Sequence, residues 1–203
     1  MPIDNPPTKA RTADSSRRRE IIEAASEVFA QKGIVAATVR DIGGRAGILS
    51  GSLYYHFSSK EEIIVEILVP VLRSQVDAFD AIVAETGDPD EILERLILSA
   101  VLQTAANPHA ARILQNETQR IRELALEDVT RLQVEVMLRW TSAVKQGINT
   151  GRFRADVDPR MASVSIADVV LGAYRFMRPM GRSSPAQVAA QLTALILNGL
   201  DTR

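Results

Sequence analysis

The chain has 203 residues, 46% of them hydrophobic, and a formal net charge of −1. This length and apolar content suffice for a sizeable core, whereas the net charge argues against a nucleic-acid binder without sequence preference. Cysteine is absent, which excludes disulfides and thiol chemistry, and no apolar run approaches the ~18 residues of a membrane helix. No apolar segment lies near the N-terminus either, so we expect no signal peptide and no membrane span, and a cytoplasmic location.

The charge is unevenly distributed. Residues 1–60 contain nine Lys/Arg and six Asp/Glu, a net charge of +3, and residues 61–203 contain fifteen and nineteen, a net charge of −4. This is the sign expected for a DNA-binding head on a neutral to acidic body.

Residues 1–14 contain three prolines and few apolar side chains, and we expect them to form a disordered arm. Arg17–Arg19 follow at the start of the first predicted helix. This basic run either contacts the DNA backbone, with the arm in the adjacent minor groove, or is a solvated turn. The helix has an apolar stripe that includes Ile21 and Phe29, and it ends at Gly33.

Residues 38–60 predict a helix-turn-helix. Val39 and Ile42 lie on one face of a first helix that Thr38 can cap, and Gly47 permits the positive φ that ends it. Gly43–Gly44 stand in the interior of this helix and should weaken it by about 1 kcal/mol each relative to Ala.

The second helix of this motif is short. Ile48 and Leu49 are expected to fill the turn before it, and Ser50 to be its N-cap. Leu53 and Phe57 lie four residues apart and should form its buried side.

The other face of the second helix carries small, hydroxylated and aromatic polar residues instead of Glu, Lys or Gln. Such a face can approach base edges and phosphates closely, as in the major groove. The predicted DNA-binding residues, base-proximal positions and phosphate contacts together, are Thr38, Arg40, Ser50, Gly51, Ser52, Tyr54, Tyr55, His56 and Lys60.

Alternatives exist for several of these residues. His56 could cap the end of the recognition helix, and Tyr55 could pack against the following helix. Arg40 and Arg45 either touch phosphate or are solvated. Lys60 stands at a helix start, where the dipole does not favour a cation, and a phosphate partner would explain it.

Helix follows helix after Lys60, and no β alternation of useful length appears. Four capping residues precede a proline at Asp88–Pro89, Asn107–Pro108, Asp158–Pro159 and Ser184–Pro185, and each pair predicts a helix start. Glu91 is expected to complete a capping box at the first of them. We predict an all-α protein of about nine helices, with a three-helix head and a six-helix body.

Residues 159–178 and 185–199 are rich in small residues, which let helix backbones approach closely. These two segments either pair with their copies in a homodimer or pack within the chain. A two-fold operator favours the dimer.

Several large side chains of the body are candidates for lining a ligand cavity: Met137, Trp140, Phe153, Tyr174, Phe176 and Met177. Trp140 follows Leu132 and Val136 at four-residue steps, which favours core packing instead. Arg175 and Arg178, beside Tyr174, could clamp an anionic group or form a surface pair. The predicted ligand-binding residues are Trp140, Tyr174, Arg175 and Arg178.

No catalytic constellation is found. His56 and His109 are the only histidines and have no metal-ligand spacing, and phosphate-loop motifs and a serine nucleophile elbow are missing. We therefore expect no metal, no cofactor and no enzymatic activity.

The segment from about residue 15 to 65 resembles the DNA-binding domain of the TetR family of bacterial regulators. The matching elements occur in order: Phe29-Ala-Gln-Lys-Gly33, Thr38-Val-Arg-Asp-Ile42, Ala46-Gly47, Gly51-Ser-Leu-Tyr-Tyr-His-Phe57 and Ser59-Lys-Glu-Glu62. Gly43-Gly44 and Leu49 depart from the family pattern. The stretch from Gly47 to Tyr54 is similar to regulators of steroid and acyl-CoA catabolism in actinobacteria.

The resemblance implies a disordered arm at 1–14, a DNA-binding domain at 15–60 and a ligand-binding and dimerisation domain at 61–203. It implies a homodimeric repressor that binds double-stranded operator DNA. A small-molecule effector, such as a lipid- or steroid-derived acyl-CoA, would release it. The alternative is an all-α small-molecule-binding protein or enzyme in which the helix-turn-helix is incidental.

Overall fold

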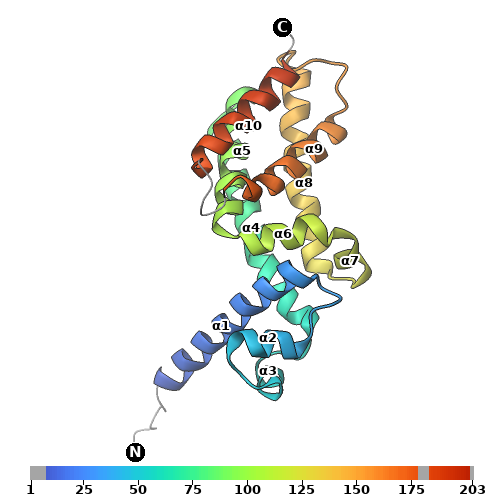
Figure 1. Ribbon diagram of the computed structural model, residues 1–203. Coiled ribbons are helices and arrows are strands. Elements are labelled where there is room, and N and C mark those ends of the chain that lie inside the picture. The colour runs from blue at the N-terminus through green and yellow to red at the C-terminus, as the bar shows by residue number, and fades with distance from the viewer. Residues whose placement is uncertain (1–7, 178–182, 202–203) are drawn as a thin grey trace, which may run out of the picture. The chain divides into compact units, whose positions relative to one another are not determined.

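The computed structural model describes residues 8–177 and 183–201 (Figure 1). This part of the chain contains ten α-helices, one 3-10 helix and a single isolated β-bridge between Phe153 and Asp201. The α-helices are α1 (Thr8–Lys32), α2 (Val39–Ala46), α3 (Ser50–His56), α4 (Lys60–Glu85), α5 (Pro89–Ala106), α6 (Pro108–Asn116), α7 (Thr118–Glu123), α8 (Glu127–Asn149), α9 (Pro159–Gly172) and α10 (Pro185–Leu200). The 3-10 helix η1 is Ala173–Arg175. The prediction of an all-α fold is confirmed.

The chain divides into two compact units at Ile67–Leu68, inside α4. The predicted boundary after residue 60 lies earlier, at the first residue of that helix. None of the helices in the described ranges is both long enough and apolar enough to cross a membrane.

In the first unit, α1 begins at Thr8 and therefore occupies residues 8–14, which we predicted to be disordered. The three prolines of that segment all precede Thr8, and neither Pro nor Gly follows before Gly33, so nothing in the sequence breaks the helix. Residues 1–7 lie outside the described residues.

The core of the first unit forms where the apolar stripe of α1 meets α2 and α3. Ile21, Phe29, Ile42, Leu53 and Phe57 are all at most 1% exposed. The predicted buried sides of all three helices are therefore confirmed.

The turn between α2 and α3 depends on two glycines. Gly47 ends α2 in the left-handed region, at φ 67° and ψ 33°. A Cβ at Gly43 would lie 3.0 Å from the carbonyl oxygen of Ile48, which is tighter than ordinary contact, so the turn would have to shift by a few tenths of an ångström to accept a side chain there. Gly44 has nothing within 4 Å of such a Cβ.

In the second unit, α5 packs against α10 and α8 against α9 (Figure 1). A continuous core fills the space between them, with the α4 residue Phe79 against Trp140 of α8 in an edge-to-face contact at 5.0 Å. Leu96, Val144 and Phe153 belong to the same core and are at most 1% exposed. Core packing of Trp140 is thus confirmed.

All four predicted helix starts in the body are present. Asp88, Asp158 and Ser184 accept hydrogen bonds from backbone N–H groups of the first turn of their helices. Asn107 does not cap α6, because its amide donates to the carbonyl of Gln103 at 3.1 Å. The capping box predicted at Glu91 is also absent: its carboxylate accepts from the Thr86 hydroxyl at 2.8 Å.

The body contains one helix more than predicted. The segment after Asn107 forms two short helices, α6 and α7, which are separated at Glu117. At that break the Thr118 hydroxyl bonds to the Leu114 carbonyl at 2.7 Å. The helix predicted over 159–178 ends at Gly172, and only η1 follows.

Candidate functional site

The outward face of α3 is the candidate DNA-binding surface. Leu53 and Phe57 bury the inner side of this helix, which leaves Tyr54 61% exposed and Tyr55 84% exposed. Gly51 and Ser52 are exposed beside them. The predicted alternative for Tyr55, packing against the following helix, is not what the structure has.

The start of α3 differs from the prediction. Leu49, not Ser50, is the N-cap residue, and its side chain is 81% exposed instead of filling the turn. The Leu49 carbonyl accepts from the Ser52 N–H at 2.9 Å, so the cap is made by backbone alone. Ser50 is the first helical residue and is half-buried.

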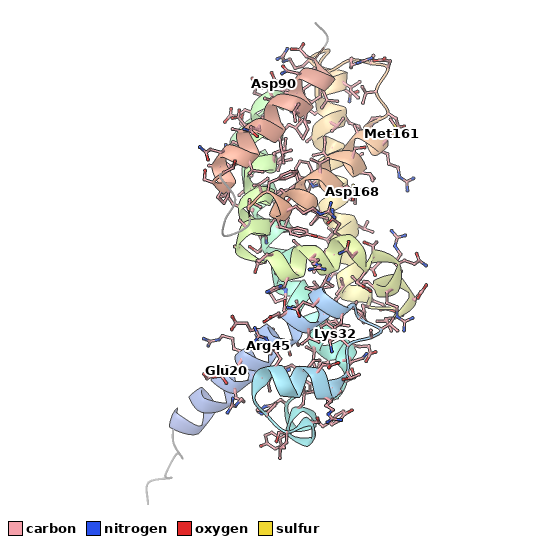
Figure 2. The ribbon with its side chains drawn as sticks, viewed as in Figure 1. Glu20, Lys32, Arg45, Asp90, Met161 and Asp168 are labelled. Carbon is pink, nitrogen blue, oxygen red and sulfur yellow. The ribbon has the colours of Figure 1, made fainter. Side chains whose placement is uncertain are left out.

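Two ion pairs fasten α2 to α1. Lys32 donates to Asp41 at 2.6 Å, and Arg45 donates to Glu27 through Nε at 2.6 Å. Figure 2 labels both cations, Lys32 on α1 and Arg45 on α2. The hydrogen bond from Lys32, with those from Thr38, lowers the pKa of the Asp41 carboxyl to about 2. Because Arg45 pairs with the Glu27 carboxylate, its charge is neutralised within the protein.

Thr38 is engaged in the capping box of α2. Its hydroxyl accepts from the Asp41 N–H at 3.1 Å and donates to the Asp41 carboxylate at 2.8 Å. Its expected cap role is confirmed, and its hydroxyl has internal partners.

Arg18 is the centre of the polar network in the first unit. Its guanidinium bonds to Glu62 at 3.0 Å, to Glu66 and to the carbonyl of His56, and lies 4.1 Å from the centre of the Phe57 ring. These carboxylates raise the pKa of Arg18. The central member of the Arg17–Arg19 run is therefore a structural residue, whereas Arg17 pairs with Glu20 at 2.7 Å.

The start of α4 is held by hydrogen bonds of its serines. Ser59 accepts from the Glu62 N–H at 3.1 Å, and Ser58 donates to the Glu62 carboxylate from its hydroxyl at 2.6 Å and its N–H at 2.7 Å. The bonds from Ser58, followed by that from Arg18, lower the pKa of Glu62 to about 2.

Lys60 has partners that the sequence did not suggest. Its ammonium donates to the carbonyls of Ile34 at 3.0 Å and Ala37 at 2.9 Å. These neutral oxygens explain a cation at a helix start, but they do not cancel its charge. Lys60 and Arg40 have no ion-pair partner within the part of the chain that the structure describes.

His56 is the last residue of α3, and its ring meets that of Tyr55 edge-on at 5.3 Å. The cap at this helix end comes from Arg18, which donates to the His56 carbonyl, and from the Phe57 N–H, which donates to Leu53.

The second unit contains a cavity of about 760 Å³. It is bounded by residues of α4 to α9. About half of the lining residues are apolar, among them Trp140 and Met137 from α8, and the others are polar or charged. All of its charged lining residues have exposed side chains: Arg122, Lys145, Asp158, Arg160 and Asp168, the last of which is labelled in Figure 2. The cavity can therefore hold an apolar body and meet charge only where solvent reaches.

Of the predicted ligand residues that the structure describes, one lines the cavity and two do not. Trp140 lines the cavity, but Tyr174 and Arg175 do not. Arg175 lies 5.7 Å from the Tyr174 ring and donates to Gln115 at 3.2 Å. Arg178 lies outside the described residues, and the helix that was to carry both arginines has already ended at Gly172. The clamp was inferred from a periodicity that the backbone does not follow.

Gln75 was missed by the sequence analysis. This α4 residue lines the cavity, is 9% exposed, and its amide nitrogen has no hydrogen-bond partner among the described residues. Such a buried unpaired donor costs about 1–3 kcal/mol. The sequence carries no signal for it, because Arg73, Ser74 and Asp77 are polar residues of the same stretch.

Two family models match the chain. One, described as bacterial regulatory proteins of the tetR family, matches residues 21–67, and the other, described as a tetracyclin repressor-like C-terminal domain, matches residues 86–200. The second match alone covers more than half of the chain.

The relatives agree with these matches. The HTH-type transcriptional repressor KstR2 of Rhodococcus jostii RHA1 is 36% identical over 198 residues, with 96% of each chain covered. KstR2 of Mycobacterium tuberculosis H37Rv is 37% identical over 191 residues, which cover 92% of this chain and 94% of that protein. The solved structure of the ketosteroid transcriptional regulator KstR2 of M. tuberculosis has 34% identity and a TM-score of 0.81, and covers 92% of this chain and 96% of that one. These relatives are regulators and not enzymes, and this chain belongs to the TetR family of bacterial transcriptional regulators.

Proposed function

We propose that this regulator is a repressor that binds a palindromic operator as a homodimer and leaves it when a small-molecule effector binds. The outward face of α3 carries the proposal, because it presents Tyr54 and Tyr55 to solvent while Leu53 and Phe57 hold the helix. The KstR2 relatives are named transcriptional repressors, which supports repression as the mode of regulation.

The proposed contacts follow from exposure and charge. Gly51 and Ser52, with Ser50, approach base edges, and the tyrosine hydroxyls bond to phosphates. Thr38 and His56 flank this face. Arg40 and Lys60 supply the attraction for phosphate, because no carboxylate among the described residues neutralises them.

Leu49 joins this set as a base contact. A leucine 81% exposed at the first turn of a recognition helix can pack against the methyl group of thymine. Leu49→Ser should relax the preference at one base pair of each half-site, whereas Ser52→Ala alters a hydrogen-bonded position. Selection from a randomised operator measures both, and an unchanged preference for Leu49→Ser would remove it from the set.

The proposed dimer forms through residues 159–178 and 185–199. On α10, Ala186, Ala190 and Ala194 lie four residues apart on an exposed face, beside Leu195, which is 72% exposed. On α9, Met161 is 67% exposed (Figure 2). Pairing of these faces between two copies would bury them.

The proposed effector is a lipid- or steroid-derived acyl-CoA. The apolar side chains of the lining suit the acyl group, and the exposed Arg122, Lys145 and Arg160 at the same lining suit the phosphates of the CoA moiety. The description of one solved relative as a ketosteroid regulator supports a steroid-derived acyl group.

A gel-shift titration tests the regulator. The probe is the DNA immediately upstream of the protein's own gene, and random DNA is the competitor. Tight binding that survives the competitor is expected, and equal affinity for both DNAs contradicts sequence-specific regulation. Addition of steroid-derived acyl-CoA, with free CoA as the control, should then release the operator, because a ligand shifts this equilibrium only when it binds the two states unequally.

A further inference from the structure

Gln75 belongs to α4 and lines the cavity of the second unit. Thr104 of α5, 5% exposed, lines the same cavity. Gln75 and Thr104 are the polar lining residues that are buried, whereas the other polar and charged residues of the lining are half-buried or exposed.

Gln75 and Gln103, two of the three glutamines that line the cavity, differ in their partners. The Gln103 amide donates to the carbonyl of Val71 and is thereby fixed to α4. The Gln75 amide nitrogen is buried and has no acceptor in residues 8–177 and 183–201. Rotation about its terminal torsion exchanges Oε1 and Nε2 within the same volume, so the N–H groups can be turned toward a bound molecule.

The residues around Gln75 limit which group of a ligand can accept its hydrogen bond. A buried carboxylate or phosphate requires a cation or several donors, and the cationic lining residues Arg122, Lys145 and Arg160 are all exposed. A ketone or ester oxygen accepts an amide N–H without that requirement.

We propose that Gln75 donates a hydrogen bond to a neutral carbonyl oxygen of the effector and thereby selects molecules oxygenated at the end that lies against α4. The inference rests on the proposed function, since it assumes that the cavity is the effector site. It adds a residue and a functional group to that site.

Trp140 provides the readout, because it lines the cavity and is the single tryptophan of the chain. The full-length protein is titrated with decalone, a saturated bicyclic ketone, and with decalin, the hydrocarbon of the same shape, while Trp140 fluorescence is followed. We expect decalone to bind about tenfold more weakly to Gln75→Leu than to the unmodified protein, the usual effect of losing one buried hydrogen bond. Decalin should bind the two proteins alike.

Gln133→Leu is the matched control, because Gln133 also lines the cavity and is half-buried. It should keep the full affinity for decalone. Equal weakening by both variants, or equal loss of decalin and decalone affinity in Gln75→Leu, assigns Gln75 to packing and overturns the inference. Failure of both probes to bind also overturns it. Operator binding by the same preparations separates these outcomes from a failure of the proposed repressor function.

Discussion

The two units use their polar side chains in opposite ways. In the first unit, Arg18 and Arg45 bond to carboxylates of the unit, whereas the candidate DNA contacts Tyr54 and Tyr55 are exposed on the outward face of α3. In the second unit the candidate contact, Gln75, is buried at the cavity and its amide nitrogen has no partner among the described residues. The binding groups of a DNA-binding surface can bond to water when DNA is absent. A buried polar group in a ligand cavity instead lacks a hydrogen bond until the ligand provides one.

Arg18→Ala should have the largest effect, because it removes the centre of the network in the first unit. It leaves Glu62 and Glu66 without their shared cation, and we expect the free energy of unfolding of this unit to fall by about 2 kcal/mol. Urea unfolding followed by circular dichroism measures the loss, while Trp140 fluorescence reports the second unit separately. Arg19→Ala, an exposed neighbour, should change stability by less than about 0.5 kcal/mol. Equal effects of the two substitutions would mean that the network contributes nothing.

Lys60→Ala tests the division between neutralised and available cations. Because Lys60 bonds to neutral carbonyls, its charge remains available to phosphate, and its loss should reduce the slope of log affinity against log salt by about 0.9. Arg45→Ala is the comparison: Glu27 already neutralises Arg45, so the slope should stay unchanged. A slope that falls only with Arg45→Ala would reverse the assignment. Protein stability is measured alongside, since Lys60→Ala also removes two hydrogen bonds.

The sequence located the first of these two regions far better than the second. Local patterns such as the Thr38 cap, Gly47 and the Leu53–Phe57 spacing predicted the helix-turn-helix, because each acts within a turn or two of helix. The partners of Arg18 and Lys60 are far away in sequence, and no local pattern announces them.

The cavity could not be predicted, since its lining comes from six helices. Trp140 was found because of its size. The arginine clamp was predicted on a helical periodicity that extends past Gly172, where the chain leaves the α-helix. Gln75 is recognisable as a candidate contact only in the structure, because what marks it is the burial of its amide nitrogen without a hydrogen-bond partner.

The pH dependence of the first unit should reflect Glu62 and Asp41. Both carboxyls have a pKa near 2 in the folded protein, below their ordinary values of 4.5 and 3.8. Their contribution is therefore complete above pH of about 5 and is lost as the pH falls toward 2. Glu62→Gln should flatten the acid side of the stability curve, as measured by urea midpoints between pH 2 and 6. A curve of unchanged steepness would exclude Glu62 as a source of this dependence.

The smallest effect is expected from the two glycines of α2, which separate helix propensity from close packing. Gly44 is exposed and open, so Gly44→Ala should raise the free energy of unfolding by up to about 1 kcal/mol. Gly43→Ala gains the same propensity, but its Cβ would lie 3.0 Å from the Ile48 carbonyl, which is tighter than ordinary contact, and that oxygen belongs to the turn before α3. We therefore expect Gly43→Ala to be the less stable of the two and to weaken operator binding, because the displaced turn carries Leu49 and Ser50. If both variants gain stability equally and bind DNA alike, the turn can yield at this point, and the glycine pair is only a weak position in the helix.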